Sequence, residues 1–114
     1  MTVYYDDRHE RIVARGPAAI AAVLLGDDVA EARSLLLCLD YYLDPYYGHT
    51  LPYEAEIWPL LQTCLVEAQD DGVIAACLQL LGDYATVPLP ILEAGLPRVK
   101  ERWRPDARAL VERP

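Results

Sequence analysis

The residues in this chain that could do chemistry are two histidines, three cysteines and a set of carboxylates. Each histidine follows two aspartates closely, so each group offers three donors of the kind that binds a metal ion. Neither histidine belongs to a spaced metal motif such as H-E-x-x-H, and carboxylates that precede helices ordinarily act as N-caps. We therefore predict caps and no metal site. The two groups are Asp6, Asp7 and His9, and Asp40, Asp44 and His49.

The three cysteines, Cys38, Cys64 and Cys77, lie in apolar segments with helical periodicity, and no two are spaced as C-x-x-C. A nucleophilic thiol needs exposure and a cationic neighbour, whereas these are surrounded by apolar and acidic residues. We predict reduced thiols in the core. The sequence also contains no phosphate-binding or nucleophile-elbow motif. We therefore predict no catalytic residue, no cofactor and no enzymatic activity.

An aromatic and acidic segment is the strongest candidate for a functional surface. Residues 44–53, DPYYGHTLPY, contain Pro45, Gly48 and Pro52, which interrupt a helix, and three tyrosines. Tyrosine gives a large contact area at small entropic cost, and carboxylates steer and pair with a cationic partner. The alternative is that individual tyrosines only pack the loop onto helices. The predicted protein-binding residues are Asp40, Asp44, Tyr46, Tyr47, His49, Tyr53, Glu54 and Glu56, which Gln79 and Asp83 extend if the helices stack.

The elements that must position this surface are helices. Apolar residues recur at steps of three and four, Asp, Pro and Gly mark the expected helix ends, and no strand is predicted. The segment 27–43 is apolar on more than one side, which is typical of a helix buried between neighbours. The predicted helices cover residues 4–16, 18–25, 27–43, 54–69 and 73–85, and short helical pieces interrupted by Gly95, Pro97 and Pro105 cover 90–114.

Composition and charge restrict the class of protein. The 114 residues, 54% of them hydrophobic, suffice for a single domain over residues 1–114. No apolar stretch spans a membrane and the N-terminus is too polar for a secretory signal, so we predict a cytoplasmic protein without membrane contact. Of the net charge of −8, residues 54–96 contribute seven acids and no base. Such a surface disfavours nucleic acid and attracts a basic protein, although solubility alone is the alternative explanation.

Two segments of the chain resemble each other. Shifting DDVAEARSLLLCLDYYLDP by 43 positions aligns it with DDGVIAACLQLLGDYATVP at eight identities in nineteen, and HEAT and armadillo units repeat every 40 to 47 residues or so. Residues 57–85 resemble one HEAT unit. HEAT units usually follow the valine of the second helix with arginine, whereas here Ile74 follows Val73 and Ala30 follows Val29. We therefore expect the Asp–Arg ladder between repeats to be missing. The predicted fold is all-α, with HEAT-like antiparallel helix pairs in a short right-handed solenoid or a compact bundle.

The string YYGHTLPYEAEIWPLL is similar to a segment of small bacterial HEAT-like proteins, several of them suspected immunity proteins of toxin systems. This resemblance implies a function in which the acidic surface occludes the active site of a basic toxin. The alternative is a structural or regulatory adaptor that scaffolds a complex or forms a homodimer through exposed leucine and tyrosine. A metal-dependent or lyase-type enzyme is a third class, and it would need polar residues clustered in a pocket.

Overall fold

The computed structural model describes residues 3–113, which form seven α-helices, three 3-10 helices and no strand. The all-α prediction is confirmed. No helix in this part of the chain is both long and apolar enough to cross a membrane. The α-helices are α1 (Asp7–Arg15), α2 (Pro17–Leu24), α3 (Val29–Leu43), α4 (Glu54–Glu67), α5 (Asp71–Tyr84), α6 (Pro90–Gly95) and α7 (Arg104–Glu112); the 3-10 helices are η1 (Pro45–Tyr47), η2 (Leu96–Arg98) and η3 (Glu101–Trp103).

The helices begin and end at the residues that local chemistry selects. Asp6, Asp28 and Asp70 are the N-caps of α1, α3 and α5, and each carboxylate accepts a backbone N–H from the first turn. Gly16 ends α1 with φ 102°, a conformation that favours glycine, and Pro17 then begins α2. The predicted helix boundaries are therefore correct to within about three residues, as is usual for boundaries read from pattern.

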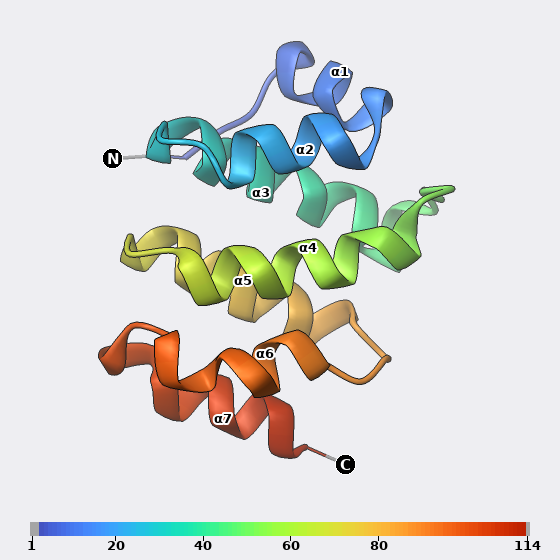
Figure 1. The fold of residues 1–114 in the computed structure, drawn as a ribbon. Helices are drawn as coiled ribbons and strands as arrows, with labels where there is room; N and C mark the ends of the chain where they lie inside the picture. The colour runs from blue at the N-terminus through green and yellow to red at the C-terminus, as the bar shows by residue number, and fades with distance from the viewer. Residues whose placement is uncertain (1–2, 114) are drawn as a thin grey trace.

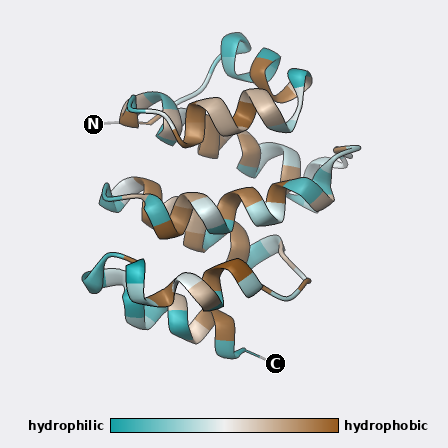
Figure 2. Ribbon diagram, in the orientation of Figure 1, coloured by the Kyte–Doolittle hydropathy of each residue, from teal (hydrophilic) through white to brown (hydrophobic). Residues whose placement is uncertain are grey.

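Six of the helices form three antiparallel pairs that lie one above another in Figure 1: α2 with α3, α4 with α5, and α6 with α7. Helices α2, α4 and α6 follow one another on one side of the stack, and α3, α5 and α7 on the other. Helix α1 packs on α2 and α3 at the N-terminal end. Hydrophobic residues are concentrated within the helices, and many hydrophilic residues lie at the turns and helix ends (Figure 2).

The middle pair supplies much of the core, because α4 and α5 are covered by helices above and below. Ile57, Leu61 and Leu65 of α4 and Ile74 and Leu81 of α5 are completely buried. The three cysteines are buried and unpaired, as the sequence predicted. Removing this apolar area from water is the main force that holds the pairs together.

The spacing of 43 residues that aligns the sequence does not align the structure. The N-caps Asp28 and Asp70 are 42 residues apart. At that spacing buried Leu39 matches buried Leu81, whereas the identity at 43 pairs Leu37, which is 38% exposed, with Leu80, which is 2% exposed. Because one residue rotates a helix position by about 100°, the five identities that lie within both α3 and α5 match side chains that face different ways. They are not evidence that the two helices occupy equivalent places.

An Asp–Arg pair joins neighbouring helix pairs, so the expectation that such a contact would be missing was wrong. The Arg33 guanidinium donates to both carboxylate oxygens of Asp70, at 2.8 and 2.7 Å. Arg33 lies four residues after Val29, one helical turn beyond the position where a HEAT arginine was sought. Gly72 makes room for it, since a Cβ there would lie 2.5 Å from Arg33 Nε.

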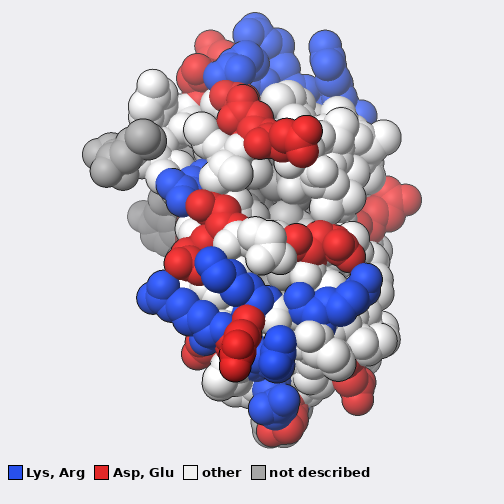
Figure 3. Space-filling model, turned by 60° about the vertical axis from the view of Figure 1, so that its left-hand side comes forward, with Lys and Arg blue, Asp and Glu red and all other residues white. Residues whose placement is uncertain are grey.

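The next carboxylate, Asp71, connects the middle pair to the C-terminal pair. It accepts hydrogen bonds from Trp103 Nε1 at 2.7 Å and from Lys100 Nζ and Arg102 Nη1 at 3.0 Å. At the N-terminal end, Glu31 accepts from Arg8 at 2.9 Å, so charged contacts recur along one edge of the stack (Figure 3). Three of the seven acids of residues 54–96, namely Glu67, Asp70 and Asp71, therefore form ion pairs with bases from the neighbouring parts of the stack.

Two glycines should respond in opposite ways to substitution by alanine. A Cβ on buried Gly95 would lie 2.6 and 2.9 Å from the methyl groups of Val66, so Gly95→Ala should lower the free energy of unfolding by about 1 to 3 kcal/mol. Exposed Gly82 has only Leu110 Cδ1 nearby, at 3.8 Å, so Gly82→Ala should leave stability unchanged or raise it by up to about 1 kcal/mol. Chemical denaturation measures both. Equal effects would contradict the close packing of α6 on α4.

Candidate functional site

The loop between α3 and α4 is an ordered, capped structure. Asp44 Oδ1 accepts the backbone N–H of Tyr46 at 2.9 Å and so starts η1. Gly48 ends η1 with φ 72°. Leu51 is buried and anchors the loop on the core. The loop therefore presents its aromatic residues from a fixed backbone.

Aromatic rings from α3 and the loop form a cluster at this end of the molecule. The ring of Tyr41 lies with its centre 4.6 Å from those of both Tyr47 and His49, and Tyr42 lies 4.9 Å from His49. Tyr46 packs edge-on against Tyr47 at 5.1 Å and is itself 85% exposed. Such ring pairs gain about 0.5 to 1.5 kcal/mol beyond area burial. These ring contacts fix the cluster in place, and Tyr46 and Tyr47 remain largely exposed to solvent.

Carboxylates surround one phenol beside the cluster. The Tyr84 hydroxyl donates to Asp40 Oδ1 at 2.6 Å. This hydrogen bond and burial raise the pKa of Tyr84, and the charges of Asp40, Asp44 and Asp83 raise it further. Tyr84 therefore stays protonated and acts as a donor. One predicted site residue, Asp40, thus contacts a residue that the prediction did not include, and the charges of Asp44 and Asp83 act on the same phenol.

The structure places the other exposed residues of the prediction at three neighbouring positions. Tyr46, Tyr47 and His49 lie together in the aromatic cluster, and Gln79 lies beside Asp40 along a groove between α3 and α5. Glu54 and Glu56 are exposed in the first turn of α4, directly after the loop.

Tyr53 is the predicted residue that points inward. It is half-buried, packs on the core and donates its hydroxyl to the carbonyl of Val13. For this tyrosine the packing alternative is the correct one. It connects the loop to α1 and contributes to the fold.

The sequence analysis did not select three tyrosines that build the cluster. Tyr41 and Tyr42 occupy the last turn of α3, and Tyr5 precedes α1, with its ring centre 6.3 Å from that of Tyr41. The adjacent pair YY just before the loop was the available signal, since the last turn of a helix shares its surroundings with the loop that follows. Tyr5 could be placed only by tertiary structure.

His9, which the sequence paired with Asp6 and Asp7, is a buried structural residue. Its Nδ1 accepts the backbone N–H of Asp6 at 3.1 Å, so Nε2 carries the proton and donates to Glu31 at 3.1 Å. Both ring nitrogens are occupied within the fold. Among residues 3–113, no three His, Cys, Asp or Glu side chains are placed to hold a metal ion.

The thiols are likewise placed for packing. Burial raises the pKa of Cys38 to about 12, which keeps the thiol protonated. Cys77 is fully buried, and both its hydrogen bond with Cys64 and its burial raise its pKa. A protonated, buried thiol is a poor nucleophile. The loop itself presents exposed aromatic side chains and carboxylates on a fixed backbone.

Two tyrosines of the loop should differ when their hydroxyl groups are removed. Tyr53→Phe loses the donation to Val13 and should lower the free energy of unfolding by about 1 kcal/mol. Tyr46→Phe changes an exposed side chain and should alter stability by less than about 0.5 kcal/mol. Urea denaturation of the two variants compares them directly. A larger loss for Tyr46→Phe would show that the exposed tyrosine supports the fold.

The chain was compared with protein-family models, with curated proteins and with solved structures. None of the three comparisons finds a significant match. The conclusions about this site therefore rest on its own geometry.

Proposed function

We propose that this chain is a binding protein that recognises a basic protein through the aromatic cluster and the carboxylates around it. The observation that carries the proposal is the exposure of Tyr46, 85%, and Tyr47, 51%, on a capped loop. Large tyrosine surfaces in water are unfavourable unless a partner covers them, and tyrosine is enriched among residues that dominate binding energy.

The preference for a basic partner follows from which acids are already paired. Glu67, Asp70 and Asp71 form ion pairs with Arg98, Arg33 and Lys100. Within residues 3–113, Glu54, Glu56 and Asp83 form no ion pair. Unpaired negative charge is therefore present beside the aromatic cluster, as it also is at Asp27 and Asp106 outside it, and beside the cluster it would steer and orient a cationic surface.

A specific form of this proposal is an immunity protein with a HEAT-like arrangement of helix pairs in the cytoplasm. The cluster would cover the active site of a basic toxin, and its carboxylates would pair with the toxin's cationic residues. The resemblance of residues 46–61 to a segment of small bacterial HEAT-like proteins, several of them suspected immunity proteins, suggests this form. The mechanism needs only burial of the toxin's groups, without chemistry on this chain.

An adaptor that self-associates is the second candidate, and exposed apolar residues on the opposite edge favour it. Leu25 is 48% and Val29 42% exposed, and both line a hollow of about 610 Å³ between the α2–α3 and α4–α5 turns. A homodimer through this edge would show a mass that rises with concentration in light scattering. The basic-partner proposal predicts a monomer when the partner is absent.

The test compares two variants with equal formal net charge. Glu54→Lys/Glu56→Lys changes exposed acids beside the cluster, and Asp27→Lys/Asp106→Lys changes exposed acids outside it. We expect the tagged parent and the second variant to capture the same basic protein from the cytosol of the source cell. The first variant should bind at least tenfold more weakly, about 1.4 kcal/mol, in a surface-binding assay.

Two further measurements make this test specific. Tyr46→Ala should weaken binding without a change in net charge, and added salt should slow association. If both charge variants capture the partner equally well, the acids near the cluster serve solubility only. If the parent captures no basic protein, the proposal fails and the adaptor takes its place.

A further inference from the structure

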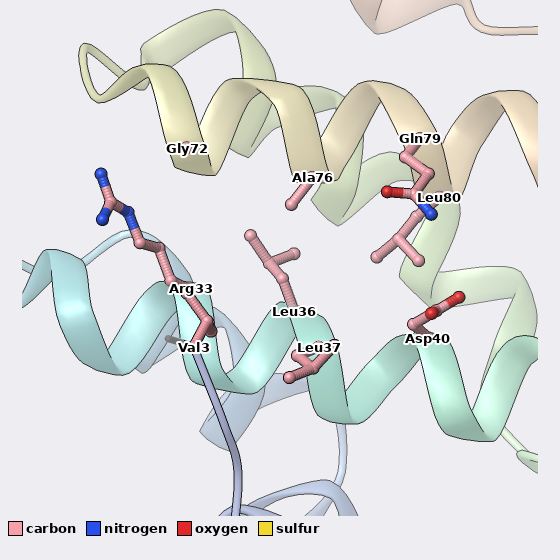
Figure 4. A pocket seen from close by; sticks show the side chains of 9 residues that line it. All are labelled: Val3, Arg33, Leu36, Leu37, Asp40, Gly72, Ala76, Gln79 and Leu80. Atoms are coloured by element: carbon pink, nitrogen blue, oxygen red, sulfur yellow. The ribbon is translucent and has the colours of Figure 1, made fainter. Parts of the chain in front are cut away.

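Helices α3 and α5 enclose a groove of about 320 Å³ on the side of the stack that they share with α7. Leu36 and Leu37 of α3 and Ala76 and Leu80 of α5 give it apolar walls (Figure 4). Leu37 is 38% exposed, so the groove leaves an apolar side chain in contact with water. Arg33 lies at one end, and Asp40 and Gln79 lie at the other.

The two ends of the groove differ in how their charges are satisfied. The Arg33 guanidinium is already bound by both oxygens of Asp70. Asp40 accepts from Tyr84 through Oδ1, and its other oxygen has no hydrogen-bond partner among the described residues. Asp44 and Asp83 lie near enough to act on the same phenol. Arg33 at the positive end is therefore paired, whereas no basic side chain among residues 3–113 forms an ion pair with Asp40, Asp44 or Asp83.

A ligand that suits this groove has an apolar stem and a cationic head. The stem would displace water from the exposed part of Leu37, whereas Leu36 and Leu80 are already almost fully buried. The head would meet the open oxygen of Asp40, with the Gln79 carbonyl as a further acceptor. An arginine side chain matches both requirements, because its guanidinium is weakly hydrated and donates in several directions at once.

We propose that this groove receives an arginine side chain of the basic partner, with its methylene stem over Leu37 and Leu80 and its guanidinium on Asp40. The inference rests on the proposed function, because it assigns to the basic partner the group that enters the groove. The aromatic cluster provides contact area, and the groove selects the cation.

The test uses butylguanidinium as a probe and the full chain labelled with carbon-13 in its leucine methyl groups. We expect saturable NMR shifts at the methyl groups of Leu37 and Leu80. Asp40→Asn keeps an acceptor for Tyr84 but removes the charge, and it should weaken the probe at least fivefold. Ala76→Leu fills the groove without changing charge and should abolish the shifts, whereas Ala109→Leu, at an exposed position on α7, should not.

Other probes decide what the groove recognises. Butylurea has a similar shape without charge, and equal shifts with it would overturn the ionic part of the proposal. Butylammonium binding as tightly as butylguanidinium would overturn the assignment to arginine and indicate lysine. Shifts confined to other leucines, or no shifts, would overturn the site itself.

This experiment and the capture experiment can fail separately. A captured basic partner together with a groove that ignores butylguanidinium would leave the proposed function in place and remove the groove from it. If the groove binds the probe but the chain captures no basic protein, the proposed function fails, and the groove remains as a site that accepts a guanidinium group.

Discussion

The turn between α4 and α5 carries the contacts on which the arrangement of the helix pairs depends. Asp70 is the N-cap of α5 and binds Arg33 of the pair before it, and Asp71 binds Lys100 and Trp103 of the segment after it. No lysine or arginine occurs between Arg33 and Arg98. The acids of the middle pair can therefore form ion pairs only with bases from the neighbouring pairs. These contacts align the three pairs. Glu54 and Glu56, which follow the loop, form no ion pair among residues 3–113.

Most of the fold could be predicted because each helix is specified locally. Asp6 and Asp28 as caps, Gly16 followed by Pro17, and apolar steps of three and four act within one or two turns, so the sequence alone places the helices. The interlayer contacts could not be predicted in this way. Arg33 and Asp70 are 37 residues apart, and only the stacking of α3 on α5 brings them together. The identities at a spacing of 43 residues do not reflect the structural alignment, in which the helices are offset by 42 residues. A shift of one residue can keep identical residue types aligned while it turns the side chains to a different face of the helix.

The parts of the candidate site that nearby sequence determines could be predicted, whereas the parts that depend on packing between helices could not. Tyr46 and Tyr47 lie in a loop that proline and glycine mark in the sequence, and both are exposed, as a loop position leads one to expect. Tyr53 lies in the same loop but turns toward Val13, and its inward direction depends on α1 packing nearby. Asp40 and Tyr84 meet across two helices, so neither helix alone signals the carboxylate cluster or the groove beside it. Residue type led to the proposal of recognition, and the geometry adds which tyrosines and which acids near the loop are exposed.

The most direct test of the claim about the turn is an NMR titration of the individual aspartate carboxyl groups. Hydrogen bonds from Arg33 hold the pKa of Asp70 below its ordinary value of 3.8, and bonds from Trp103 and Lys100 do the same for Asp71. We expect both carboxyls to titrate below 3.8 in the parent chain. In Arg33→Met, the pKa of Asp70 should rise and that of Asp71 should stay low. An Asp70 carboxyl that titrates at 3.8 in the parent, or that ignores the loss of Arg33, would contradict the account.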